Sequence, residues 1–245
     1  MENKKYAFSL IELSIVILVI GILIAGIIGA QNLIIKSRLF STRAITKSSP
    51  VIGIKDLSLW LETTSDKSFL SDYTNNDAIA AASGAKVWLD LNNQSITKNH
   101  ALSTSSYPHA SNPAYFENGI NSLPSLKFDG SYDYLNLTNT SLLNNTSYTI
   151  FVVEKSTKAT GKTNYWLAPK AATSCSANTC FNMGHENLTS GTYTIYMSHF
   201  ANFLATTSTQ ISGLAYKNNI PILHSGFFST AGSRKYFYNG NCRKN

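Results

Sequence analysis

Charged residues are scarce in this sequence, at 13% of 245 residues against about 25% in an average globular protein. Serine, threonine, asparagine and tyrosine take their place, which favours a solvated all-β surface. The formal net charge is +7, but basic residues never run longer than two and carry no nucleic-acid-binding motif, so we expect no nucleic-acid partner. The nearest cluster, Lys36, Arg38, Arg43 and Lys47, follows an apolar segment and suits lipid head groups or a polar helix end.

Cysteine is also scarce, with three residues. Cys175 and Cys180 lie five positions apart among turn-forming residues, and in an oxidising compartment they could close a small disulfide loop. Two reduced surface thiols are the alternative. A zinc site needs about four ligands, and no second cysteine pair or His-x-x-x-His follows. Cys242 has no evident partner in the sequence.

The sequence shows no arrangement typical of catalysis or of a bound cofactor. Paired carboxylates on one face of a strand, which glycan hydrolysis requires, are missing from every predicted strand, so we expect no enzyme. Asp129 and Asp133 bracket a Gly-Ser turn, where they would cap backbone amides or, alternatively, bind calcium with loop carbonyls. The histidines show no metal-ligand spacing, and we expect each at a surface or interface; they are His100, His109, His185, His199 and His224.

One long apolar run is present near the N-terminus. From Leu13 to Ala30, eighteen positions carry no charge and twelve are isoleucine, leucine or valine. As a helix this run spans about 27 Å, close to the hydrocarbon thickness of a bilayer. The twelve residues favour insertion by roughly 4–7 kcal/mol, which exceeds the cost of about 3 kcal/mol for one central carboxylate. The run should therefore insert even with Glu12 at its edge.

The residues that precede the run read Lys4-Lys5-Tyr6-Ala7, then Phe8-Ser9-Leu10-Ile11-Glu12. With the apolar run, this stretch resembles the prepilin signal of type IV pilins and type II secretion pseudopilins. The resemblance implies that a prepilin peptidase cleaves between Ala7 and Phe8 and that Phe8 becomes the N-methylated terminus. Glu12 is then the fifth mature residue, and the amine of a neighbouring subunit's Phe8 could neutralise it during filament assembly.

Two features depart from that family. Ala7 stands where glycine is usual before the cut, and glycines at 21, 26 and 29 replace the proline that many members carry in the helix. A cleaved secretory signal and an uncleaved anchor remain alternatives for the segment. We predict a leader at residues 1–7, a helix at 8–48 with its transmembrane part at about 10–30, and a linker at 49–55.

After Pro50 the pattern changes to short alternating segments separated by turn residues, which predicts an all-β sandwich or jelly roll over residues 56–245. The predicted strands are residues 57–61, 86–91, 126–128, 133–137, 148–155, 165–167, 192–197, 211–215, 222–228 and 235–238. Asn239-Gly240 predicts a two-residue hairpin, yet five residues follow it. We therefore expect a C-terminally truncated head with an exposed edge strand.

Several segments of the head, in their order, resemble a laminin-G-like or concanavalin A-like lectin domain. They are Leu59-Trp60-Leu61, Val87-Trp88-Leu89-Asp90, residues 119–124, 126–130, 133–135, 149–153 and 236–240. The resemblance implies two curved antiparallel sheets that bind glycans or proteins. Aromatic residues in loop-like stretches could stack on sugars; they are Tyr107, Tyr115, Tyr132 and Tyr216.

Together these features predict an α+β chain: a pilin-type transmembrane helix followed by a concanavalin A-like jelly-roll sandwich. The function this implies is a minor pilin or pseudopilin that displays an adhesive, lectin-like head on a type IV-like filament. We expect it in the bacterial inner membrane with an extracytoplasmic head, partnered by prepilin peptidase, pilin subunits, pilus or type II secretion machinery and a glycan or surface protein. The alternatives are a membrane-anchored glycan-binding or structural protein outside any filament, and a glycan hydrolase.

Overall fold

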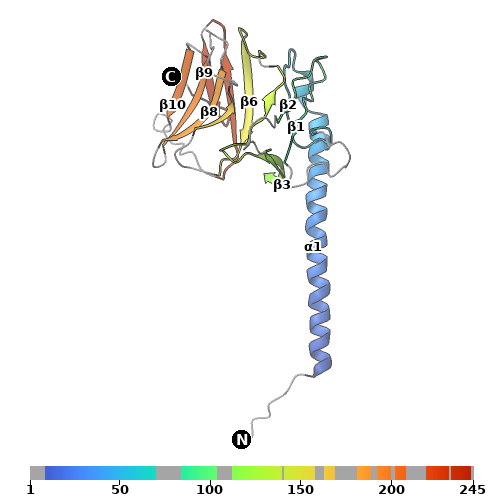
Figure 1. Cartoon of the computed structure of the whole chain (residues 1–245). Coiled ribbons are helices and arrows are strands. Elements are labelled where there is room, and N and C mark those ends of the chain that lie inside the picture. The colour runs from blue at the N-terminus through green and yellow to red at the C-terminus, as the bar shows by residue number, and fades with distance from the viewer. Residues whose placement is uncertain are drawn as a thin grey trace. The chain divides into compact units, whose positions relative to one another are not determined.

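The computed structural model of the chain (Figure 1) describes ten segments of it. These are residues 9–69, 84–103, 112–139, 141–157, 163–168, 181–188, 192–199, 202–207, 219–231 and 233–243. The chain divides into two compact units, residues 1–49 and residues 50–245, and each is described separately.

The first unit contains one helix, α1, from Leu10 to Lys47. Its 38 residues make it about 57 Å long. It begins at Ser9, whose backbone is extended and whose side chain caps the first turn. It ends at Ser48, whose amide and hydroxyl both donate to the Ala44 carbonyl at 3.1 Å, and Pro50 then prevents a further helical turn. The predicted single long helix is confirmed, and its end lies where the sequence placed it.

The apolar side chains of α1 are exposed over its first half. From Leu13 to Ile28 the isoleucine, leucine and valine residues have exposed fractions of 49–64%. Among the described residues, α1 is the one helix long and apolar enough to cross a membrane. Because all its backbone hydrogen bonds close within the segment, such a helix can be surrounded by hydrocarbon without leaving a buried polar group unsatisfied.

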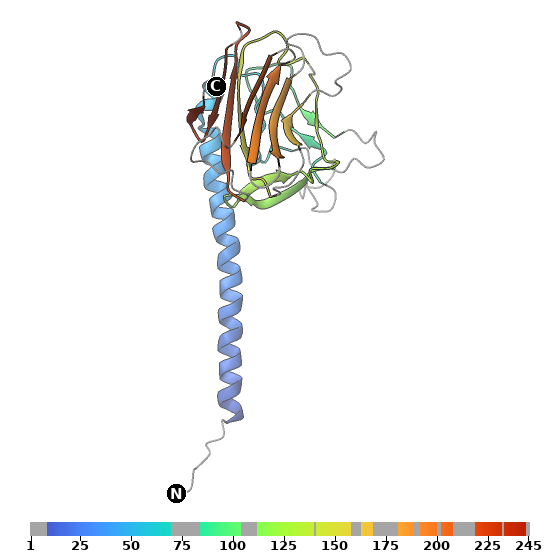
Figure 2. The same ribbon diagram turned by 90° about the vertical axis from the view of Figure 1, so that its left-hand side faces the viewer.

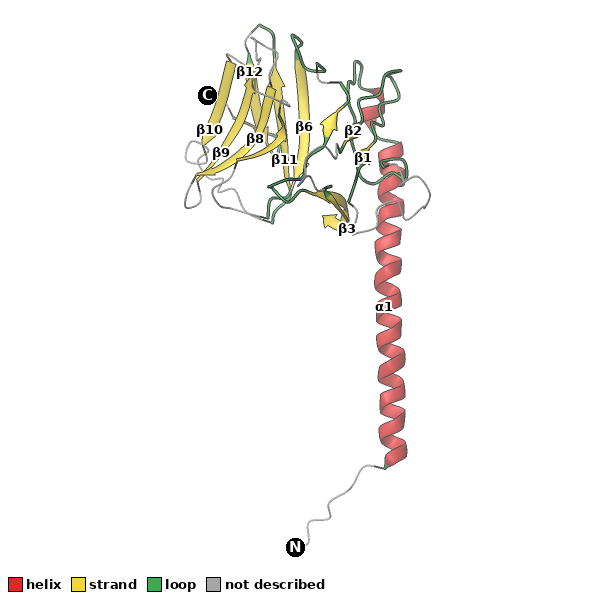
Figure 3. Ribbon diagram, viewed as in Figure 1, coloured by secondary structure: helices red, strands yellow, loops and turns green. Residues whose placement is uncertain are grey.

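The second unit, which we call the head, is built mainly of strands (Figure 3). Its elements are the 3₁₀ turn η1 (Pro50–Gly53), β1 (Val87–Trp88), β2 (Ala101–Leu102), β3 (Ala114–Ile120), β4 (Leu123–Lys127), β5 (Asn136–Leu137), β6 (Tyr148–Glu154), β7 (Thr163–Leu167), β8 (Phe181–Leu188), β9 (Thr192–His199), β10 (Asn202–Thr207), β11 (Ile222–Phe228), β12 (Arg234–Tyr238) and β13 (Asn241–Arg243).

Two antiparallel sheets of four strands each form the main part of the head. One has the order β13-β12-β11-β6 and the other the order β10-β9-β8-β7, and Figure 2 shows the orange strands of the latter running side by side. A three-stranded sheet, β1-β2-β5, and the hairpin β3-β4 complete the described strands. The strands confirm that the head is rich in β-structure, and the described ones form several small sheets. A jelly-roll topology stays a prediction.

The core lies between the two four-stranded sheets. The buried apolar residues of β8 and β9 pack with those of β11 and β12 in one cluster: Phe181, Met183, Ile195, Met197, Ile222, Phe228, Tyr236 and Tyr238. Along β6, half-buried positions alternate with exposed ones, because successive side chains of a strand point to opposite faces of the sheet. Burying each large side chain contributes about 1.5–3 kcal/mol, so this cluster stabilises the association of the two sheets.

Some strand predictions were wrong. Residues 57–61 form no strand; the Trp60 amide donates to the Asp90 carboxylate at 3.0 Å and the Trp60 carbonyl accepts from Leu91, so a side chain replaces the partner strand. Strands β2, β3, β8, β10 and β13 were not predicted, because their polar and small residues weaken the alternation signal. The predicted strand 211–215 lies outside the described residues.

Of the segment predicted as a linker, residues 49–55, all but the first residue belong to the head. Residues 50–53 form η1, and the Gln94 side-chain amide donates to the carbonyls of Ile52 and Ile54 at 2.7 and 2.6 Å. Residues 50–54 are therefore held to the head by side-chain hydrogen bonds.

The predicted hairpin at Asn239-Gly240 is confirmed. Both residues have positive φ, +46° and +79°, as a type I′ turn requires. The turn joins β12 to β13 with Tyr238 opposite Asn241, and among the described strands β13 lies at one edge of its sheet and β6 at the other.

Candidate functional site

The first candidate site is the start of α1. The Ser9 hydroxyl accepts from the Ile11 amide at 3.4 Å, and the Glu12 carboxylate accepts from the Ser9 amide at 2.9 Å. This reciprocal arrangement is a capping box, which satisfies amides that the first helical turn leaves open. The carboxylate also lies at the positive end of the helix dipole. Ala7 and Phe8, the predicted cleavage and methylation residues, lie outside the described residues.

The Asp129–Asp133 turn is built from hydrogen bonds between carboxylates and backbone amides. One oxygen of Asp129 accepts from the amides of Ser131, Tyr132 and Asp133 at 2.7, 2.8 and 3.0 Å. Asp133 returns the contact by accepting from the Asp129 amide at 2.8 Å. These bonds fix the turn; calcium at this turn stays a prediction.

The predicted disulfide residues Cys175 and Cys180 lie outside the described residues, as does His109. Cys242 lies opposite Phe237 in the pairing of β12 with β13. Within the described part of the chain, no group of three or more His, Cys, Asp or Glu side chains is arranged to hold a metal ion.

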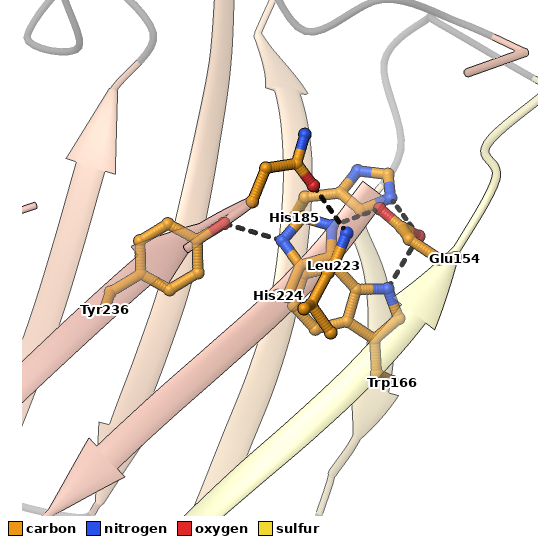
Figure 4. A network of polar contacts seen from close by, with 7 residues as sticks. Glu154, Trp166, His185, Leu223, His224 and Tyr236 are labelled. Carbon is orange, nitrogen blue, oxygen red and sulfur yellow. Dashed lines mark hydrogen bonds and ion pairs between the residues drawn. The ribbon is translucent and has the colours of Figure 1, made fainter. Parts of the chain in front are cut away.

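The head contains a second candidate site that the sequence did not predict, a cluster of polar side chains between the two four-stranded sheets (Figure 4). We call it the Glu154 cluster; its members are Glu154 on β6, Trp166 on β7, His185 on β8, His224 on β11 and Tyr236 on β12. Each histidine was expected at a surface or interface; His185 and His224 are instead buried in the head, at 2% and 0% exposed.

The carboxylate of Glu154 is the centre of this cluster. One oxygen lies 3.0 Å from His224 Nε2. The other accepts from Trp166 Nε1 at 2.7 Å and lies 3.3 Å from His185 Nε2. The Tyr236 hydroxyl lies 2.6 Å from His224 Nδ1, so Figure 4 shows the His224 ring between Tyr236 and Glu154. Each ring nitrogen of His224 therefore has a partner, and both carboxylate oxygens accept.

The surroundings shift the proton affinities of these groups. Burial raises the pKa of Glu154, but the hydrogen bonds and charges of His185 and His224 outweigh it and hold that pKa well below its ordinary value. Burial lowers the pKa of His224, a change that the Glu154 carboxylate opposes and His185 reinforces. Glu154 is therefore ionised near neutral pH, and His224 is neutral with its Nε2 proton directed at the carboxylate.

A neutral His224 makes the hydrogen bonds of the cluster consistent in direction. Tyr236 O–H donates to Nδ1, His224 Nε2–H donates to Glu154, and the indole N–H donates to the other oxygen. The arrangement therefore holds a buried carboxylate with imidazole and indole groups, and it fixes which atom of each hydrogen bond carries the proton.

A sequence signal for this cluster existed in the alternation of the strands. Tyr148, Ile150 and Val152 share the inward face of β6 with Glu154, and Ile222 and Phe228 share theirs with His224. A charged or titratable residue in register with core residues needs a buried partner. The partner itself is not readable, since Glu154 and His224 are 70 positions apart.

Comparison with known proteins bears on the N-terminal segment. Residues 3–28 match the family model described as the prokaryotic N-terminal methylation motif. No curated protein and no solved structure matches the chain. The motif supports a type IV pilin-like or pseudopilin role and implies processing by a peptidase and assembly with pilin or secretion machinery. With the exposed apolar helix, it is consistent with anchoring in a membrane.

Proposed function

We propose that this chain is a minor pilin or pseudopilin, whose head is a lectin-like binding module displayed on a type IV-like filament. The observation that carries the proposal is the methylation motif of residues 3–28, together with a helix whose apolar side chains are exposed over its first half. Before assembly the helix anchors the chain in the inner membrane with the head on the extracytoplasmic side. In the filament, the same surface packs against other pilin helices.

Glu12 is central to this proposal because it is the acidic residue of the apolar segment. Its carboxylate accepts a hydrogen bond from the Ser9 amide within its own chain. After cleavage between Ala7 and Phe8, the new amine of a neighbouring Phe8 gives the carboxylate a cationic partner. A paired charge in an apolar filament core is far less costly than a single one, so pairing favours assembly at the correct register.

The binding role of the head is supported by exposed aromatic side chains. Tyr132, Phe151 and Tyr165 are 57%, 66% and 53% exposed, and rings of this kind stack on sugars or on apolar protein surfaces. Tyr115 is a poorer candidate, since it is half-buried and packs edge-on against Phe69 with ring centroids 5.5 Å apart. We propose binding without catalysis. A polysaccharide panel tests this part, and turnover of any member would favour the hydrolase alternative.

The assembly role is tested by Glu12→Ala, with Glu117→Ala as the matched control, because Glu117 is an exposed acid of the head. We expect Glu12→Ala to remain in the membrane fraction, since the apolar run inserts without it, and to be absent from sheared filaments. Glu117→Ala should assemble like the wild type. Assembly of Glu12→Ala at the wild-type level would contradict the proposal.

If neither the wild type nor any variant is found in filaments while the chain stays in the membrane, the anchored alternative is favoured instead. The exposed helix alone is enough for that role. The two functions therefore separate on filament content and on the effect of Glu12.

A further inference from the structure

The Glu154 cluster connects the two sheets of the head rather than lying within one of them. His224 and Tyr236 belong to the same sheet as Glu154, whereas Trp166 and His185 belong to the opposite sheet. One oxygen of the Glu154 carboxylate lies 3.0 Å from His224 Nε2 of its own sheet. The other lies 2.7 Å from Trp166 Nε1 and 3.3 Å from His185 Nε2 of the opposite sheet. A single side chain thus carries polar contacts across the core.

The aromatic rings reinforce this connection. The Trp166 ring of one sheet lies against the His224 ring of the other, with centroids 4.2 Å apart, and also against His185 at 5.7 Å. A change in charge on His224 therefore changes its interaction energy with residues of both sheets. In this interior an unpaired charge is costly.

We propose that the Glu154 cluster is an acid-operated latch, which holds the two sheets together near neutral pH and releases them when the medium acidifies. Near neutral pH the carboxylate is satisfied by imidazole and indole donors. On acidification, His224 gains a proton at Nδ1, and the Tyr236 hydroxyl 2.6 Å away has to turn from donor to acceptor. The positive charge that results lies on a ring that is 0% exposed, where desolvation disfavours it.

The sign of the effect follows from the proton affinities. His224 has a pKa below its ordinary value, first because of burial, so the unfolded chain binds its proton more readily than the folded chain. Stability is therefore lost as the pH falls below about 6.5, the ordinary histidine value. Glu154, whose pKa is also lowered, extends the loss in the same direction below about pH 4.3.

Other titratable groups face the cluster from neighbouring strands and do not oppose this change. Tyr238 of β12 packs against His224 with ring centroids 5.8 Å apart, and burial and the Glu154 charge both raise its pKa, so it stays neutral. The hydroxyl of Tyr236, on the same strand, forms a hydrogen bond with His224 Nδ1 at 2.6 Å. The described inward side chains of β9, Ile195 and Met197, are apolar.

The test is urea unfolding of the full chain in mild detergent, followed by tryptophan fluorescence at about pH 7.5 and about pH 5.5, on either side of the ordinary histidine pKa. The key variant is His224→Gln, whose amide can donate to Glu154 and accept from Tyr236 but does not titrate. The control is Glu117→Gln, an exposed residue of β3 that lies outside the cluster.

Between these two pH values we expect the folding equilibrium constant of the wild type to fall by up to about tenfold, because one pH unit of this range lies below the ordinary histidine pKa. The same factor is expected for Glu117→Gln, and a clearly smaller one for His224→Gln. The proposal is overturned if the wild type shows no loss, or if folded His224→Gln loses as much as the wild type.

If His224→Gln does not fold at the higher pH, NMR titration of the His224 ring in the folded wild type decides. Because burial disfavours the imidazolium, the ring should gain its proton at a pH below about 6.5, the ordinary histidine value. Protonation of His224 at or above that pH in the folded chain would overturn the latch. Neither outcome depends on whether the chain enters a filament.

Discussion

The helix and the head satisfy their polar groups in opposite ways. In α1 the backbone hydrogen bonds close within the segment, the cap comes from Ser9 and Glu12, three positions apart, and the apolar side chains are exposed. In the head, the apolar side chains are buried together with a carboxylate and two histidines that are 14%, 2% and 0% exposed. The helix therefore depends on its neighbours in sequence, and the head on residues far apart in sequence.

This difference determines where each part is vulnerable. A helix with local hydrogen bonds stays formed in hydrocarbon whatever happens to the head. The head loses stability when any one long-range partner is removed, because a buried polar group left without a partner costs about 1–3 kcal/mol. Substitutions can therefore be chosen that affect one part and leave the other unchanged.

The largest expected effect is that of Glu154→Gln. The amide nitrogen it introduces would face N–H donors of Trp166, His185 or His224, where the carboxylate oxygens now accept. We expect the free energy of unfolding of the head to fall by about 3 kcal/mol, measured by urea unfolding with tryptophan fluorescence. Glu117→Gln, an exposed acid on β3, should change it by less than about 0.5 kcal/mol. Equal effects of the two would show that the cluster contributes nothing.

A comparison of two glycines comes next. A Cβ at Gly184 would collide with the Asn164 carbonyl oxygen and lie 2.8 Å from Tyr165 Cα, so β7 would have to move away from β8. A Cβ at Gly29 of α1 would meet nothing within 4 Å. Gly184→Ala should therefore destabilise the head by about 1–3 kcal/mol, whereas Gly29→Ala should leave both parts folded. Thermal unfolding monitored separately for strand and helix content checks this, and an undisturbed Gly184→Ala head would refute the close approach of β7 and β8.

How much of the molecule the sequence predicts follows the same division. The helix was readable from Leu13 to Ala30 and from Ser48-Ser49-Pro50, because length, composition and stop signals are local. In the head, β6 and β11 were readable from alternation, and the Asn239-Gly240 turn from its two residue types. Strand β8 was not readable, because Asn182, Gly184 and Glu186 are residue types of low strand propensity. With β8 unassigned, the inward placement of His185 could not be predicted.

The smallest expected effect is at the helix cap. Ser9→Ala removes the acceptor of the Ile11 amide, and N-cap losses of this kind cost about 1 kcal/mol. Amide hydrogen exchange in the first turn of α1 should then become about fivefold faster, while unfolding of the head is unchanged. Ser14→Ala is the matched control, because its hydroxyl donates to the Ile11 carbonyl at 2.8 Å and caps no amide. Faster exchange in both variants alike would argue against a specific cap.

The role of Glu12 depends on processing of the N-terminal segment as a prepilin, and mass spectrometry of the protein isolated from its native membrane measures that processing. We expect a mature chain that begins at Phe8 and carries one methyl group on its terminal amine. A chain that keeps Met1, or one that begins near Gln31 after the apolar run, would contradict it and remove the cationic partner on which the role of Glu12 depends.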